Sequence, residues 1–336
     1  MTYLIILALL VLAELLYFRV ADHFNIIDKP NERSSHSSIV LRGGGVIFSL
    51  SMIAWMVLMC IRGENSIVLE YLPFLIGLLL VAGVSFWDDV KSLPDSIRLV
   101  VQFSAMALMF WSMGIMHWNM WWIVILASIV CVGATNVINF MDGINGITAG
   151  YALAVLLPLA LLNKDLAFID SSFLVVAIIG VLVFCIFNFR PKGKAKCFAG
   201  DVGSISIAFI MLYAIGRLVE QTQDITYLIF LLVYGIDGCL TIVHRIMLHE
   251  NLGEAHRKHA YQLMANELKI GHVKVSSLYM LLQLAVSLGF IYLCPDSIAA
   301  HWGYLVGTAV VLGAAYVLFK KKYYHLHEEY LNSLKK

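Results

Sequence analysis

The sequence predicts an all-α polytopic membrane protein, and three observations lead to this fold class. Hydrophobic residues make up 61% of the 336 positions, whereas charged residues make up only 13%. Apolar runs of about 17 to 22 residues, long enough to cross a bilayer as helices, recur along the whole chain. Lys and Arg gather in every second connection between these runs. A soluble domain would carry about twice as much charge, so that class is excluded.

About eleven apolar runs are expected to span the membrane, within a single domain that covers residues 1–336. The only long connection between them, at about 244–274, has helical composition in its centre. The predicted spans are residues 3–20, 44–61, 68–85, 97–115, 121–138, 144–162, 172–189, 203–219, 226–243, 275–293 and 301–319.

The distribution of positive charge predicts the orientation. Twenty of the 23 Lys and Arg residues lie on one side if the N-terminus is outside, and Arg62, Lys164 and Arg217 are the exceptions. The positive-inside rule therefore places the N-terminus outside and the C-terminus in the cytoplasm. The cytoplasmic segments that follow from this orientation are about 21–43, 86–96, 136–146, 190–203 and 244–274.

The first cytoplasmic segment combines basic residues with the glycine run 43–45. Glycines ahead of a helix let backbone N–H groups approach an anion closely, and the helix N-terminus favours negative charge. The alternative is charge that serves only topology, beside a close helix–helix contact. The residues expected to bind a phosphate-bearing substrate here are Lys29, Arg33, His36 and Arg42.

Three aspartates are candidates for metal binding and acid–base chemistry. Asp88 and Asp89 are adjacent at the inner end of the third run, where like charges repel and are costly beside a bilayer. A divalent cation or a shared proton is the usual reason to tolerate such a pair. Asp201 lies between Gly200 and Gly203 at the start of the eighth run, where it could ligate a metal. The alternatives are a solvated helix cap for the pair and an N-cap for Asp201.

The third cytoplasmic segment holds Asn136, Asn139 and Asp142, each three residues after the one before. A helical backbone would place all three on one face. Amides at this spacing can bind a base or sugar edge, and the carboxylate can contribute to a metal site or accept hydroxyl hydrogen bonds. A turn at Asp142-Gly143 that separates two spans is the alternative, but it does not account for the asparagines.

The long segment contains a cationic, histidine-rich stretch that is predicted to be helical. His256 and His259 would share one face, with Arg257 and Tyr261 paired four residues apart. Imidazoles interleaved with Arg and Lys suit phosphate oxygens better than a metal. The alternative is a basic interfacial helix on anionic lipid.

All of this chemistry lies in cytoplasmic segments, and each segment offers groups of the kinds that bind phosphate or a divalent ion. Phosphoryl transfer depends mostly on positioning and charge neutralisation, so this combination favours that reaction class.

At these motifs the chain resembles the polyprenyl-phosphate N-acetylhexosamine-1-phosphate transferases of glycosyltransferase family 4. The motifs follow the family order over most of the chain: Pro-Asn-x-Arg-x-x-His and Gly-Gly, Asp-Asp, Asn-x-x-Asn-x-x-Asp-Gly, Gly-Asp-x-Gly-Ser, and the late histidine segment. The resemblance implies transfer of a sugar 1-phosphate from a UDP-N-acetyl sugar to undecaprenyl phosphate, with release of UMP. It also implies Mg²⁺, with Mn²⁺ as an alternative, and a bacterial inner membrane, with a periplasmic N-terminus and the active site facing the cytoplasm.

The resemblance assigns roles residue by residue. Asp201 would ligate Mg²⁺, Asp88 would deprotonate or orient the lipid phosphate, and Asp89 would support it near the metal. Asn139 and Asp142 would position the nucleotide or the metal. The residues that would bind the diphosphate or the sugar are His256, Arg257 and His259.

The late segment departs from the consecutive histidines of the pentapeptide translocases and resembles O-antigen initiating enzymes. This form argues against a pentapeptide substrate and leaves the N-acetyl sugar open. The sequence leaves a homodimer open as well and gives no sign of nucleic-acid binding.

Three alternative functions are weighed against the transferase. A transporter or flippase for an anionic lipid or nucleotide sugar should carry mid-span charges and internal repeats, and neither stands out in the sequence. A CDP-alcohol phosphatidyltransferase would need a spaced run of acids that is absent from the sequence. A scaffold in an envelope-synthesis complex would not need five polar cytoplasmic segments.

Overall fold

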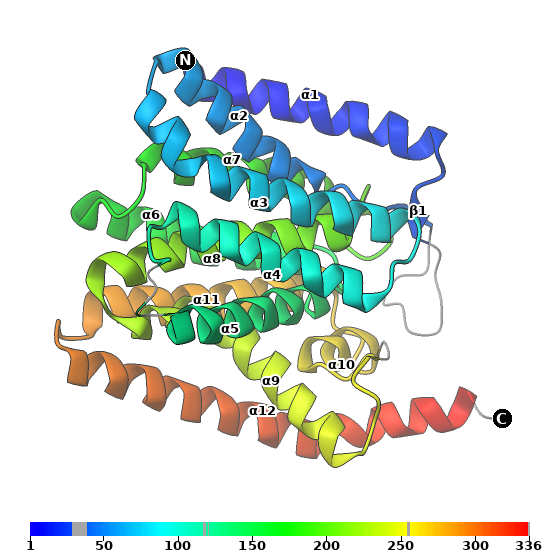
Figure 1. Ribbon diagram of the computed structural model, residues 1–336. Coiled ribbons are helices and arrows are strands. Elements are labelled where there is room, and N and C mark those ends of the chain that lie inside the picture. The colour runs from blue at the N-terminus through cyan, green and yellow to red at the C-terminus, as the bar shows by residue number, and fades with distance from the viewer. Residues whose placement is uncertain (29–38, 117–118, 120, 254–255, 335–336) are drawn as a thin grey trace.

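The computed structural model describes residues 1–28, 39–116, 119, 121–253 and 256–334, and Figure 1 shows them as a bundle of long helices. The helices are α1 (Thr2–His23), α2 (Val46–Arg62), α3 (Asn65–Val90), α4 (Asp95–Ser112), α5 (Trp121–Phe140), α6 (Ile147–Leu166), α7 (Ser171–Asn188), α8 (Gly200–Thr222), η2 (Ile225–Leu231, 3-10), α9 (Leu232–Met247), α10 (Ala260–Asn266), α11 (His272–Leu293) and α12 (Ile298–Leu334). The short strands β1 (Ile27–Asp28) and β2 (Val40–Leu41) pair antiparallel at one end of the bundle.

The helices confirm an all-α polytopic membrane protein. Within the described ranges, nine helical segments are long and apolar enough to cross a membrane, counting η2 and α9 as one. All eleven predicted spans fall on helices, but α2 has 17 residues and α4 is not among the nine. The first three turns of α4 carry Asp95, Arg98 and Gln102, which lowers its apolar character. The count of eleven and the orientation stay predictions.

Helix α8 is the central element of the bundle. Nearly every residue from Val202 to Ile215 is buried, so α8 contacts neighbours on all sides. Small residues let those neighbours approach: a Cβ added to Gly45, the residue before α2, would lie 2.2 Å from the Cα of Gly203. Close backbone packing of this kind is the usual way for helices to associate in lipid.

The segments predicted to be cytoplasmic meet at one end of the bundle. The backbone N–H of Gly44 donates to the carbonyl of Phe198 over 2.9 Å. The hydroxyl of Tyr261 in α10 donates to the carbonyl of Phe140 over 3.0 Å. Figure 1 shows β1 and α10 on this same side. Polar segments far apart in sequence are thereby brought together.

The α2–α8 contact gives a stability prediction. Gly45→Val is expected to destabilise the fold by at least about 1–3 kcal/mol, because the new side chain would overlap the α8 backbone. Gly83→Val is the matched control, since no described atom lies within 4 Å of a Cβ at that helical glycine. Thermal unfolding of the detergent-purified variants measures both. Equal melting temperatures would contradict the close α2–α8 packing.

Candidate active site

A carboxylate from α3 caps the N-terminus of α8. Oδ1 of Asp89 accepts from the backbone N–H of Asp201, and Oδ2 accepts from that of Val202, each over 3.0 Å. The Nε of Arg42 lies 2.7 Å from Oδ1, and the Asp89 side chain is buried. A negative charge satisfies the unpaired N–H groups and the positive end of the helix dipole. Asp89 therefore joins α3, α8 and the residue that follows β2.

The glycine before Asp201 is required by this arrangement. Gly200 has φ +69°, in the left-handed region, and a Cβ there would lie 2.5 Å from Oδ2 of Asp89. A larger residue would push the capping carboxylate away from α8. The Gly-Asp pair of the sequence motif is thus explained by the approach of Asp89.

Arg98 of α4 links the other two aspartates. Its Nη1 lies 3.1 Å from Oδ2 of Asp88, and its Nη2 lies 3.2 Å from Oδ2 of Asp201. Arg42 approaches the other oxygen of Asp201 at 3.8 Å. The two carboxylates are partly accessible, at 11% and 18% side-chain exposure.

These contacts test the predicted metal ligands. Among the described residues, no group of three or more His, Cys, Asp or Glu side chains is arranged to hold a metal ion. Mg²⁺ is commonly held by one or two carboxylates together with substrate phosphates, and Asp88 and Asp201 fit that pattern. Asp89 is less available, because it is buried and each of its oxygens already accepts from a backbone donor. Its observed contacts are those of a helix cap, and its role as a metal ligand stays a prediction.

Two amides of α5 line a cavity beside Asp201. Nδ2 of Asn136 donates to Oε1 of Gln102 over 2.9 Å. Oδ1 of Asn139 accepts from the hydroxyl of Ser204 over 2.6 Å, which fixes the amide against α8. The cavity measures about 460 Å³ and opens to solvent. Its lining comprises Asp95, Arg98, Leu99, Gln102, Asn136, Asn139, Phe140, Asp201, Leu252, Gly253, His256 and His259.

Asp142 does not share the face of the two asparagines, which corrects the prediction. Helix α5 ends at Phe140, so Asp142 lies in the turn that follows. Its carboxylate accepts from the hydroxyl of Thr148 in α6 over 2.6 Å, and it is absent from the cavity lining among the described residues. Burial raises the pKa of the Asp142 carboxyl to about 6. Its observed contact is within the α5–α6 turn, as the turn alternative predicts.

An aspartate of α9 orients His259 toward the cavity. Oδ1 of Asp237 lies 3.2 Å from Nδ1 of His259, and Asp237 also accepts from the Tyr279 hydroxyl over 2.5 Å and from the Ala260 N–H over 3.0 Å. The other ring nitrogen of His259, Nε2, is buried and has no partner within the described part of the chain. Because the carboxylate holds Nδ1, Nε2 is the ring nitrogen left without a described partner in a residue that lines the cavity.

His256 lines the same cavity, in a different protonation state from the one that a cationic patch would suggest. Burial, together with electrostatic repulsion by His259 and nearby basic residues, lowers the pKa of His256 to about 3. The imidazole is therefore neutral near pH 7. It can donate one hydrogen bond and accept one, but it adds no positive charge.

Arg257 points away from the cavity, contrary to prediction. Its guanidinium pairs with Oε1 of Glu267 at 3.0 Å and lies 4.3 Å from the centre of the Tyr330 ring. The described residues 256–259 are not helical, so the expected spacing of Arg257 and Tyr261 on one helix is wrong. Arg257 instead attaches this segment to α12. The predicted Lys29, Arg33 and His36 lie outside the described residues.

Comparison with known proteins gives a family match over part of the chain. The glycosyl transferase family 4 model matches residues 71–218, which contain the three aspartates and the two asparagines of the site. Over these residues the chain is similar to glycosyl transferase family 4.

Curated relatives agree with the family 4 match. The chain is similar to a probable undecaprenyl-phosphate N-acetylglucosaminyl 1-phosphate transferase of Bacillus subtilis, with 24% identity over 74% of this chain and 72% of the relative. It is also similar to phospho-N-acetylmuramoyl-pentapeptide-transferases. The Thermotoga maritima protein is 26% identical over 37% of this chain and 39% of its own length. The Shouchella clausii protein is 36% identical over 26% of each.

Two residues of this site are absent from the sequence prediction. Arg98 contributes there only to the inner positive charge, although Asp95, Arg98 and Gln102 form a polar stripe at helical spacing that indicates a polar face of α4. Asp237 is a single acid within an apolar run, and an ionisable residue there is by itself a signal of function.

The capping role of Asp89 predicts a loss of stability that does not depend on metal. Asp89→Asn should destabilise the fold by about 2–4 kcal/mol, because an amide nitrogen would face a backbone N–H and Arg42 would lose the nearer of its two charge partners. Asp95→Asn is the control, since that side chain is 79% exposed and its ion pair is long, at 3.8 Å. Melting temperatures are measured in EDTA and in Mg²⁺. A lower melting temperature of Asp89→Asn that appears only in Mg²⁺ would support Asp89 as a metal ligand.

Proposed function

We propose that the chain transfers an N-acetylhexosamine 1-phosphate from a UDP-sugar to undecaprenyl phosphate and releases UMP. The observation that supports this most is the cavity itself, where Asp201, Arg98 and two histidines face two amides at one end of an apolar bundle. Such a site suits a diphosphate joined to a sugar and a nucleotide, next to a membrane that holds the lipid acceptor. The relatives described above carry names that fit the same reaction.

The proposed reaction is a single displacement at phosphorus. An oxygen of undecaprenyl phosphate bonds to the phosphorus that carries the sugar. The bond from that phosphorus to the bridging oxygen of the diphosphate breaks, and UMP leaves with the electron pair. Asp88, positioned by Arg98, would accept a proton from the lipid phosphate or orient it. The product is a polyprenyl-diphosphate sugar of the kind that initiates a cell-surface polysaccharide.

The other residues bind and orient. Asn136 and Asn139 would hold the nucleotide or sugar through their amides. His259 would donate from Nε2 to a phosphate oxygen, and neutral His256 would bond to the sugar or the diphosphate. Asp88 and Asp201 would hold Mg²⁺ or Mn²⁺, which when bound would offset the negative charge of the diphosphate. We place the cavity on the cytoplasmic side of a bacterial inner membrane, because basic residues are concentrated in the segments that form it.

Release of UMP tests the proposal. Purified protein with undecaprenyl phosphate and Mg²⁺ is expected to release UMP with at least one UDP-N-acetyl sugar, and EDTA should stop the reaction. Asp201→Asn should remove this activity while the protein still inserts and folds, because Asp201 both lines the cavity and contacts Arg98. Wild-type turnover in Asp201→Asn would remove that residue from the site. No release with any UDP-sugar would favour a transporter or flippase.

Substitutions of His259 and Arg257, two residues of the histidine segment, should have different effects. His259→Ala is expected to lower kcat/KM for the UDP-sugar by about 10²-fold, since it deletes a donor aimed at the substrate. Arg257→Gln should keep kcat/KM near wild type and lower the melting temperature, because Arg257 contacts Glu267 and Tyr330 instead. Steady-state kinetics and thermal unfolding separate the two effects. The reverse pattern would return Arg257 to the substrate site.

A further inference from the structure

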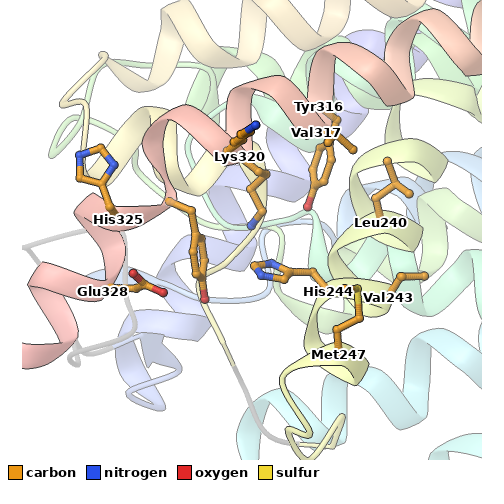
Figure 2. A pocket seen from close by; sticks show the side chains of 11 residues that line it. Leu240, Val243, His244, Met247, Tyr316, Val317, Lys320, His325 and Glu328 are labelled. Atoms are coloured by element: carbon orange, nitrogen blue, oxygen red, sulfur yellow. The ribbon is translucent and has the colours of Figure 1, made fainter.

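A second cavity lies between α9 and the C-terminal half of α12, and Figure 2 shows the side chains that line it. Its volume is about 480 Å³, and among the described residues it shares none with the candidate active site. We refer to it as the α9–α12 groove. Its lining comprises Leu240, Val243, His244 and Met247 of α9, and Tyr316, Val317, Lys320, Lys321, Tyr324, His325 and Glu328 of α12.

The groove changes from apolar to basic along α12. Val317 and Met247 are 55% and 71% exposed, which places apolar surface at its open side. The basic side chains Lys320, Lys321 and His325 follow on the same face of α12, together with the carboxylate of Glu328. Figure 2 shows Leu240, Val243 and Met247 on one side and His325 and Glu328 on the other. A phospholipid presents its chemistry in this same order, from acyl chain to headgroup.

The length of α12 puts the basic part at the membrane surface. The helix has 37 residues, which corresponds to about 55 Å, whereas a bilayer core is about 30 Å thick. Its apolar part ends where Lys320, Lys321 and Lys322 begin. Figure 1 shows its C-terminal part extending past the other helices. The lysines therefore lie at headgroup depth if α12 spans the membrane as predicted.

The basic end of the groove has polar capacity left for a ligand. Nδ1 of His244 is buried and has no hydrogen-bond partner within the described residues. Its ring lies edge-on to Tyr324, at 4.6 Å between centres. Lys320 is buried, with Nζ 4.8 Å from the Tyr324 ring, while Lys321 is exposed. An anionic group here would meet a hydrogen-bonding nitrogen and at least one lysine.

We propose that the α9–α12 groove binds an anionic phospholipid, with the phosphate near Lys321 and His325 and an acyl chain along Val243 and Val317. Charge complementarity at the surface and the apolar wall below it support this occupant over a soluble anion. Each lysine near an anionic membrane surface contributes about 1 kcal/mol to binding.

A hydrogen bond links a residue of the groove to the histidine segment beside the active-site cavity. Nζ of Lys320 donates to the backbone carbonyl of Lys258. The next residue is His259, which lines the active-site cavity. A lipid that steadies Lys320 would therefore also steady the histidine segment. This part rests on the proposed transferase function and predicts a lower KM for the UDP-sugar when the lipid is bound.

Lipid binding is tested directly on the full-length protein. Lys321→Gln is compared with Lys322→Gln, which removes the same charge one residue later, from a side chain that does not line the groove among the described residues. After delipidation, phosphatidylglycerol is titrated and the bound lipid is counted by native mass spectrometry. Lys321→Gln should weaken binding about fivefold, which corresponds to about 1 kcal/mol, and Lys322→Gln should leave it unchanged. Equal losses in the two variants would overturn the proposal.

Two further measurements identify the occupant and separate this proposal from the catalytic one. Undecaprenyl phosphate is added as a competitor. If it displaces phosphatidylglycerol from the wild type but not from Lys321→Gln, the groove binds the lipid substrate. That result would overturn the proposal. Inorganic phosphate should not compete, and competition by it would contradict a lipid ligand. Because bound lipid is counted without turnover, failure of the transferase assay would leave this result standing.

Discussion

The site depends on one buried carboxylate, that of Asp89. Removing an ion from water costs several kcal/mol, so a buried charge persists only when donors surround it. Two backbone N–H groups of α8 and the guanidinium of Arg42 supply them. This contact fixes the start of α8, and with it Asp201, relative to α3. Asp88, the adjacent residue, is held by Arg98 instead, so two neighbouring acids acquire separate roles.

The helical membrane fold could be predicted from the sequence, and so could the segments that meet at one end of the bundle. The length and hydropathy of the apolar runs and the distribution of charge are visible without any tertiary information. Roles of single side chains were predicted less well. Asp142 and Arg257 were assigned on the assumption that a helix continues through them, but α5 ends at Phe140 and α10 begins at Ala260. Asp89 was assigned to metal from its neighbour Asp88 and from the family resemblance. Its capping contacts could not be foreseen, because the backbone donors come from α8, 112 positions later in the chain.

The polar residues of the site also explain why membrane helices here depart from simple apolar character. Gln102 and Asn136 pair with each other between α4 and α5, and Asn139 pairs with Ser204 of α8. Unpaired, each such group would cost free energy within the bundle, whereas paired it fixes the relation of two helices. The same hydrogen bonds hold the amides at the edge of the cavity. They therefore both pack the helices and position the residues of the site.

Helix α12 completes the site although it lies outside the part of the chain that matches the family model. Lys320 holds the carbonyl of Lys258, His327 contacts Glu267 at 3.0 Å, and Tyr330 covers Arg257. These three residues of α12 follow one another at helical spacing, so one face of the helix braces both sides of α10. Asp237 of α9 holds His259 as well. The histidine segment has little regular structure before Ala260, and its geometry is therefore set by α9 and α12 together.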